Sequence, residues 1–150
     1  MVSEPLHYLD SSVVLAWLLE CSDALASIEG SRRVASSRLL WTEVARGLYR
    51  ALQSDRLSAP ATAAARHRFA RLASRIASIR ITESVLRRAE GPYPLVVRSL
   101  DAVHLASAEQ WLQAEVGAGD PALVSLWSLD ARMNQCAALL GFSTPLMERI

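Results

Sequence analysis

Short apolar segments alternate with longer segments of helical periodicity, and this alternation limits the folds open to the chain more than any other feature. Residues 122–129 are almost continuously apolar, which is typical of a strand buried on both faces. Further strand candidates are residues 6–9, 33–36 and 79–81, and residues 144–147 are a candidate edge strand. Strands that alternate with helices predict an α/β protein with a mostly parallel central sheet covered by helices on both faces.

Helical patterns fill the intervals between these strands. Helices are expected at residues 12–20, 23–30, 39–53, 83–90, 101–115 and 130–141, and a long alanine-rich helix is expected to start at Pro60, whose fixed φ suits a first turn. Residues 91–94 (Gly-Pro-Tyr-Pro) predict a loop. A chain of 150 residues without repeats or linkers is of the usual size for one domain, so residues 1–150 are assigned to a single domain.

Composition excludes several classes of protein. Hydrophobic residues make up 51% of the chain and charged residues 21%, which indicates a globular rather than a disordered protein. The longest strongly apolar run, residues 13–19, is far shorter than the roughly 18–20 residues of a membrane span, so no membrane association is expected. No secretory signal is visible, and two cysteines do not make a disulfide framework, so we expect a cytoplasmic protein.

All 16 basic residues are arginines, and they are unevenly distributed. Residues 1–31 carry five acids and no base, residues 32–88 carry 13 arginines and three acids, and residues 89–150 carry three arginines and seven acids. This pattern indicates a polyanion-binding surface beside a carboxylate-rich centre, although solvated helix faces would also explain it. The absence of lysine excludes Schiff-base catalysis and a P-loop.

Four acidic residues stand where such a sheet binds its ligands or at the starts of helices. Asp10 and Asp130 follow predicted strands, and ligands bind beyond the carboxyl ends of parallel strands. Asp10, Asp101 and Asp130 could each simply cap a helix, and Glu43 could pair with Arg46. Together, however, converging carboxylates would repel one another unless a cation intervened.

Oxygen ligands without paired His or Cys suit Mg²⁺ or Mn²⁺ rather than zinc. Two such ions could clamp a phosphodiester and activate water, so no nucleophilic side chain would be required. Ser11 and Ser12 could then hydrogen-bond the metal-binding carboxylates.

Four segments of the chain resemble the PIN-domain pattern, and in particular the VapC-type ribonuclease toxins of bacterial toxin–antitoxin pairs. They are residues 8–12 (YLDSS), 42–44 (TEV), 98–106 (RSLDAVHLA) and 128–133 (SLDARM). The resemblance implies an α/β/α sandwich, RNA cleavage dependent on Mg²⁺ or Mn²⁺, inhibition by a small cognate antitoxin, and frequent homodimerisation. It also implies a metal-binding quartet of Asp10, Glu43, Asp101 and Asp130, with Ser128 as a small hydroxyl residue near the last acid.

Several residues around this quartet have both a functional and a structural interpretation. Arg46 and Arg98 could contact substrate phosphates, or Arg46 could form an ion pair that holds Glu43 in place. His104, three residues after Asp101, could act as a general acid or base or could be a hydrogen-bonded packing residue. A basic face for an RNA backbone, or alternatively for an acidic antitoxin tail, is offered by Arg68, Arg71 and Arg75.

The leading hypothesis is therefore a metal-dependent endoribonuclease toxin. The first alternative is a catalytically inactive PIN module that binds RNA or a protein partner. A phosphoacceptor receiver would normally need a lysine, and a haloacid-dehalogenase-type phosphatase would need an aspartate where Ser12 stands, so both of these fit less well.

Overall fold

Four parallel strands form one central sheet in the computed structural model, which describes residues 4–147. They are β1 (Leu6–Leu9), β2 (Val34–Ser37), β3 (Ala77–Ile79) and β4 (Val124–Trp127), in the spatial order β3-β2-β1-β4. All three pairings are parallel, so every strand ends at the same edge of the sheet. The predicted central parallel sheet is confirmed, and β1 lies in its interior.

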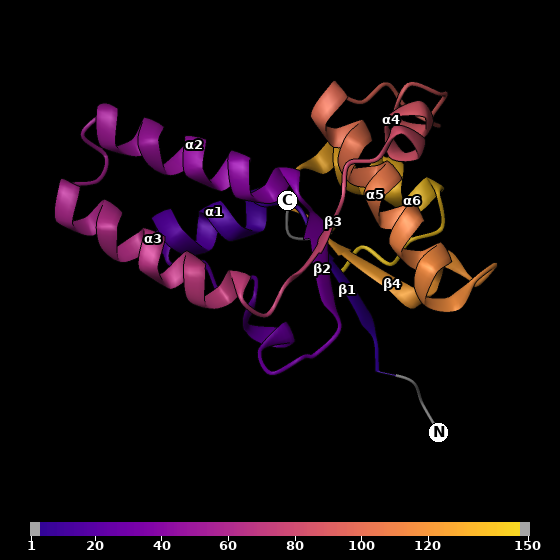
Figure 1. The fold of residues 1–150 in the computed structure, drawn as a ribbon, viewed down its shortest axis with the longest axis horizontal. Helices are drawn as coiled ribbons and strands as arrows, with labels where there is room; N and C mark the ends of the chain where they lie inside the picture. Colours follow the sequence, from indigo (N-terminus) through magenta and orange to yellow (C-terminus); the bar gives the residue numbers. More distant parts are fainter. Residues whose placement is uncertain (1–3, 148–150) are drawn as a thin grey trace.

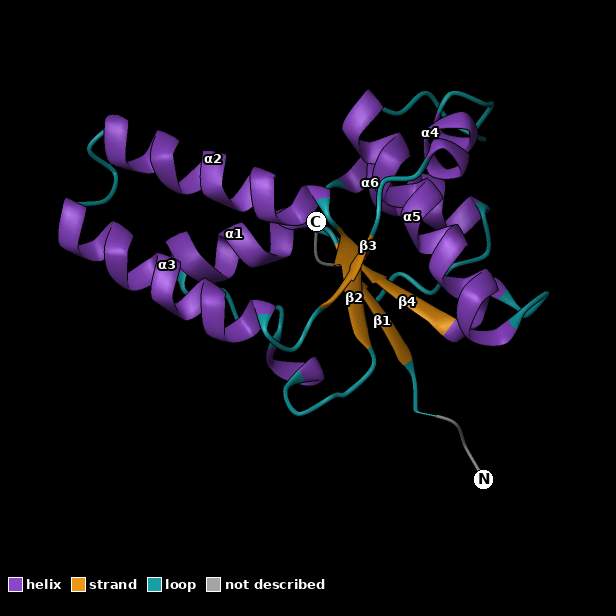
Figure 2. Ribbon diagram, viewed as in Figure 1, coloured by secondary structure: helices purple, strands orange, loops and turns teal. Residues whose placement is uncertain are grey.

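Helices cover both faces of this sheet, as Figures 1 and 2 show. One face carries α1 (Ser11–Glu20), α2 (Leu39–Gln53) and α3 (Ala59–Ala73), and the other carries α4 (Glu83–Ala89), α5 (Ser99–Val116) and α6 (Ala131–Leu139). Short 3₁₀ turns are found at Ala26–Ile28 and Pro121–Leu123. The arrangement is the expected α/β/α sandwich. None of the described helices is both long enough and apolar enough to cross a membrane.

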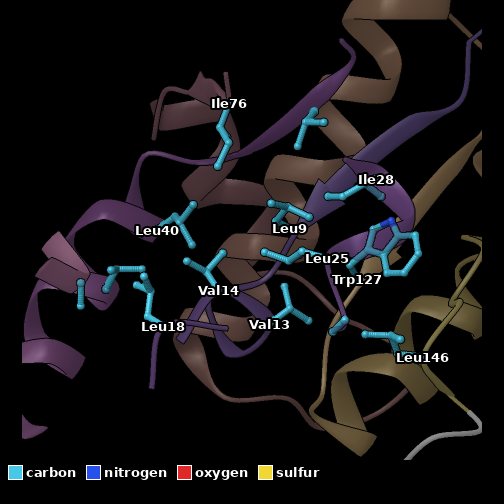
Figure 3. Packing of buried hydrophobic residues seen from close by; sticks show 14 of the residues in the cluster. Leu9, Val13, Val14, Leu18, Leu25, Ile28, Leu40, Ile76, Trp127 and Leu146 are labelled. Atoms are coloured by element: carbon cyan, nitrogen blue, oxygen red, sulfur yellow. The ribbon is translucent and has the colours of Figure 1, made fainter. Parts of the chain in front are cut away.

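The two-residue period of the strands divides the core into one cluster on each face. Leu9 and Trp127 point to the α1 side, where they pack with Val13, Val14 and Leu40 (Figure 3). On the other face, side chains of β1, β2 and β4 pack against α5 and α6; this cluster includes Leu6, Tyr8, Leu105, Leu126 and Met133. Both faces of β1, β2 and β4 are therefore covered, which explains the nearly continuous apolar run in β4.

Side-chain caps fix the starts of several helices. The Ser58 hydroxyl accepts the N–H of Ala61 at the start of α3, where Pro60 occupies the first turn as predicted. Thr82 caps α4 in the same way, by accepting the N–H of Val85. Because these caps are encoded within three residues of each helix start, they could be recognised in the sequence.

Three local predictions differ from the structure. The strand predicted at residues 79–81 is Ala77–Ile79, because its partner strand ends at Ser37, opposite Ile79, and leaves the next residues unpaired. The predicted edge strand at residues 144–147 is wrong, because only Ser143 forms an isolated bridge, to Ser125, before the chain turns at Pro145. The predicted helix at residues 23–30 is limited to the 3₁₀ turn Ala26–Ile28.

Candidate active site

The acidic residues meet at the edge of the sheet where the strands end. Asp10 directly follows β1, and its backbone N–H donates to the Trp127 carbonyl at 3.0 Å, which places it beside the end of β4. Asp130 follows β4 and precedes α6, and Asp101 lies in the first turn of α5. Glu43 reaches the same edge from α2, on the opposite face of the sheet from α5 (Figure 1).

Two serine hydroxyls orient the Asp10 carboxylate. Ser12 Oγ donates to Asp10 Oδ2 at 2.7 Å, and Ser128 Oγ donates to the same oxygen at 2.8 Å. Both hydroxyls also accept backbone N–H groups, from Leu129 at 2.9 Å and from Asp130 at 3.0 Å. Asp10 occupies the N-cap position of α1, but its side chain does not cap the helix. Its Oδ2 is therefore committed to the serines, while Oδ1 faces the site.

Ser12 and Ser128 thus both hydrogen-bond to the Asp10 carboxylate. Ser11 differs, because its side chain makes no hydrogen bond to any residue in the described range 4–147.

Glu43 is held by a buried histidine rather than by an arginine. The Nε2 atom of His104, which is fully buried, lies 2.6 Å from Glu43 Oε1 and 3.8 Å from Asp10 Oδ1. Its other ring nitrogen, Nδ1, lies 2.7 Å from the hydroxyl of Tyr8. The predicted Glu43–Arg46 ion pair does not form, because Arg46 instead stacks over Tyr49 with its guanidinium carbon 5.5 Å from the ring centroid.

Arg98 bridges the other two acids. Its Nε lies 3.4 Å from Asp101 Oδ2 and its Nη2 lies 3.2 Å from Asp130 Oδ2. The second oxygen of Asp130, Oδ1, accepts the backbone N–H of Met133 at 2.8 Å and so caps α6. Asp130 therefore caps a helix, as one of its two interpretations predicted, but the cap involves only one of its two carboxylate oxygens.

The surroundings of the acidic cluster disfavour the charged form of Asp101 and favour the charged form of His104. Burial raises the pKa of Asp101, and the neighbouring Asp10 and Asp130 raise it further, while Arg98 offsets only part of the effect. Burial alone would lower the pKa of His104, but the hydrogen bond to Glu43 and the surrounding carboxylates raise it overall. The N-termini of α1, α5 and α6 also point to this edge and favour anionic side chains there.

The donor set suits a divalent cation with a preference for oxygen. The site offers four carboxylates, and the raised pKa of Asp101 indicates negative charge that a cation would relieve. Within residues 4–147, however, no three His, Cys, Asp or Glu side chains already stand close enough together to hold an ion. The acids are instead paired by two cationic or polar groups of the protein itself, Arg98 and His104.

The predicted basic face lies elsewhere in the molecule. Arg68, Arg71 and Arg75 line a pocket of about 420 Å³, together with Val34 and Ile76, which stand at the beginnings of β2 and β3. The pocket is therefore at the opposite edge of the sheet from the acids. Arg68 stacks on Trp17, which also lines the pocket, at 4.6 Å from the ring centroid.

The sequence did not indicate that Tyr8 and Asn134 contribute to the site, nor which residues His104 contacts. His104 is the hydrogen-bonded packing residue considered above, but no local signal showed that it contacts Glu43. Tyr8 belongs to a strongly apolar segment, so its hydrogen bond to His104 gave no local signal either. Asn134 is buried, and its Nδ2 donates to the carbonyls of Ser128 and Asp130, which holds the loop that carries the last acid. The spacing of four residues between Asp130 and Asn134 was the only signal available for that contact.

A comparison with protein-family models identifies the chain. The model described as "PIN domain" matches residues 7–117, which include Asp10, Glu43, Asp101 and His104. The match ends before β4, so the placement of Asp130 rests on the pairing of β1 with β4. No curated protein sequence matched the chain. Since the matched segment covers most of its length, the chain belongs to the PIN domain family, whose members are generally nucleases.

Proposed function

We propose that the protein is an endoribonuclease that depends on Mg²⁺ or Mn²⁺, with Asp10, Glu43, Asp101 and Asp130 as the metal ligands. The observation that carries this proposal is the pattern of hydrogen bonds to the carboxylate oxygens. Asp10, Glu43 and Asp130 each have one oxygen fixed by a hydrogen bond from the protein, and the other is left for a cation or for Arg98. Such outer hydrogen bonds are typical of metal ligands, because they set the orientation of the ligand.

The side chains of the site would have separate roles in such a reaction. The metal, when bound, supplies charge stabilisation for the phosphodiester and activates water as the nucleophile. The carboxylates hold it, and Ser12 and Ser128 keep Asp10 in one orientation. Arg98, whose side chain is 80% exposed, is free to exchange its carboxylate partners for a substrate phosphate.

We further propose that the enzyme is a VapC-type toxin that is restrained by a small antitoxin and assembles as a homodimer. This rests on the four sequence segments that resemble such toxins. The exposed apolar residues Val96 and Leu100, on either side of Arg98, are suitable for burial between two copies of the chain. Light scattering of the purified protein, with and without its co-expressed genomic neighbour, would measure both associations.

Mapping of new RNA ends tests the proposed activity. Purified protein is incubated with total cellular RNA in Mg²⁺ or in EDTA, and discrete cuts are expected only with the metal. D10N and D101N should each reduce cleavage by roughly two orders of magnitude or more, the scale expected when a group that stabilises charge is removed. D55N is the matched control, because Asp55 is exposed and has a φ of 57°, which asparagine tolerates well.

Two results would contradict the proposal. Cleavage by D10N at the wild-type rate would show that the acidic cluster is not the active site. RNA binding without cleavage, by folded protein that is free of antitoxin, would favour the inactive PIN module instead.

A further inference from the structure

We propose that Tyr8 and His104 are positioning residues for Glu43: a buried hydrogen-bond chain from β2 through Tyr8 and His104 orients the Glu43 carboxylate toward the cation. This inference rests on the proposed function, because it assigns these residues a task at the same site. It goes beyond the acidic quartet, since neither side chain is itself expected to touch the metal or the RNA.

The chain of hydrogen bonds is continuous and anchored in the sheet. The backbone N–H of Ser37 donates to the Tyr8 hydroxyl at 3.1 Å, and that hydroxyl lies 2.7 Å from His104 Nδ1. His104 Nε2 then lies 2.6 Å from Glu43 Oε1. Tyr8 and His104 are both completely buried, so water cannot replace either contact. The position of Glu43 Oε1 is thereby tied to the main chain of a central strand.

The direction of the last hydrogen bond does not depend on the protonation state of His104. A carboxylate has no proton to give, so Nε2 must carry the hydrogen that lies between it and Glu43. Neutral His104 then accepts at Nδ1 from Tyr8, whereas charged His104 donates at Nδ1 to the tyrosine oxygen. In both states Glu43 Oε1 accepts a hydrogen bond, and Oε2 has no hydrogen-bond partner among residues 4–147.

Glu43 depends on this chain more than the other acids depend on their supports. Asp10 and Asp130 each have a support close to them in the chain, from the first turn of the following helix: Ser12 for Asp10 and the N–H of Met133 for Asp130. Glu43 has a longer side chain and comes from α2, whereas His104 comes from α5 on the opposite face of the sheet. The His104–Glu43 contact therefore joins the two helical layers across the edge of the sheet, and it is the only hydrogen bond to the Glu43 side chain within the described residues.

Direct measurement of Mn²⁺ binding by calorimetry on the full-length protein tests the assignment, together with steady-state RNA cleavage. H104L should weaken Mn²⁺ binding by about 10- to 100-fold, the usual effect of removing a hydrogen bond that orients a metal ligand. It should lower kcat more than it raises KM for RNA. H104Q keeps an N–H donor within reach of Glu43 and should recover most of the affinity. Y8F removes only the distal hydroxyl and should cause a smaller loss of affinity.

A double-mutant cycle separates positioning from general stability. In an E43Q background, H104L and Y8F should cause no further loss of Mn²⁺ affinity, because the carboxylate that they orient is gone. Y93F is the matched control, because the Tyr93 hydroxyl shares its hydrogen between the Ala102 carbonyl and Glu109 Oε1, each 3.4 Å away, and not with Tyr8, His104 or Glu43. It should lower the thermal midpoint without changing Mn²⁺ affinity.

The outcomes distinguish this inference from the proposed function. The inference is wrong if folded H104L binds Mn²⁺ as the wild type does, or if the losses persist unchanged in the E43Q background. A wild-type protein that binds Mn²⁺ but cuts no RNA would overturn the nuclease proposal, while the binding series would still decide the role of His104. A wild-type protein that binds no Mn²⁺ would overturn both.

Discussion

At the scale of single residues, Arg98 occupies carboxylate oxygens that a bound cation would need. Its guanidinium lies within 3.4 Å of both Asp101 and Asp130, and it is the positive group nearest to these two acids. A divalent ion that uses the same carboxylates must displace it. Because the side chain is mostly exposed, each of its ion pairs is weak, and a substrate phosphate can readily take the place of the carboxylates.

Replacing Arg98 should therefore strengthen metal binding while it weakens RNA binding. We expect R98Q to bind Mn²⁺ about 1.4- to fivefold more tightly, because an exposed ion pair contributes about 0.2–1 kcal/mol. KM for RNA should rise in the same variant. R132Q is the control, because Arg132 lies close by on α6 but donates to the Val96 carbonyl rather than to an acid. Weaker Mn²⁺ binding by R98Q would mean that Arg98 supports the metal ligands instead of competing with the ion.

His104 should make the stability of the metal-free protein dependent on pH. Its folded-state pKa is raised above 6.5, because the hydrogen bond to Glu43 and the nearby carboxylates outweigh the effect of burial. A group with a raised pKa stabilises the fold fully below its unfolded pKa, and this stabilisation is lost as pH rises through the folded pKa. Urea unfolding in EDTA should therefore give a free energy of unfolding that decreases as pH rises above 6.5.

The H104Q variant provides the control for this prediction. Its free energy of unfolding should be nearly independent of pH over the same interval. His7 does not interfere, because burial lowers its pKa and it titrates below 6.5. An equally steep decrease in H104Q would show that another group is responsible.

At the scale of elements, the helices α1, α5 and α6 begin at the acidic cluster, whereas α3 lines the pocket at the opposite edge of the sheet. The starts of α1, α5 and α6 direct their N-termini toward the carboxylates, so these helices contribute to the electrostatics of the site. The helix α3 instead contributes Arg68 and Arg71 to the pocket at the other edge of the sheet, and Arg75 lines the same pocket from just beyond the end of this helix. Changes to α3 should therefore affect stability without affecting the metal site.

Removing the cap of α3 tests this separation. S58A leaves the N–H of Ala61 without its hydroxyl partner and should reduce the free energy of unfolding by about 1 kcal/mol, with a range of about 0.5–2. Mn²⁺ affinity should not change. S84A is the control, because Ser84 is exposed and makes no side-chain hydrogen bond within residues 4–147, so its stability should stay within about 0.5 kcal/mol of wild type. A loss of Mn²⁺ affinity in S58A would show that α3 and the site are coupled.

At the scale of the whole molecule, the uneven charge of the sequence corresponds to two separate surfaces. The acids gather where the strands end, and Arg68, Arg71 and Arg75 line the pocket near the beginnings of β2 and β3. An RNA that contacts both must extend around the sheet. A short oligonucleotide at the acidic site would not reach the arginines.

Substitution of exposed arginines distinguishes these modes of binding. The double variant R71Q/R75Q should bind long RNA more weakly, and the slope of log affinity against log salt should become shallower by about one for each phosphate that the variant no longer neutralises. Cleavage of a short oligonucleotide should be unchanged. R66Q is the control, since Arg66 is exposed on α3, as Arg71 is, but does not line the pocket. An unchanged salt slope for R71Q/R75Q would show that the pocket does not bind RNA phosphates, and would favour an acidic protein segment as its ligand.

Features that depend on neighbours in the chain could be predicted from the sequence. The apolar run of β4, the start of α3 near Pro60, and the position of Asp10 after β1 are set by residues within a few positions of one another. The parallel sheet follows from the alternation of strands and helices. The pairing of β1 with β4 then brings Asp10 and Asp130 to the same edge.

The tertiary structure alone decided which distant side chains the acids contact. Tyr8 and His104 are 96 residues apart, Glu43 and His104 are 61 apart, and Asp10 and Ser128 are 118 apart. No local pattern distinguishes a histidine that packs in the core from one that holds a carboxylate, because both lie on the buried face of a helix. The same applies to Arg68, which stacks on Trp17 at the far edge of the sheet. Such contacts form only when packing brings distant segments together, so the sequence determined the acids and their local partners, and the fold determined their distant partners.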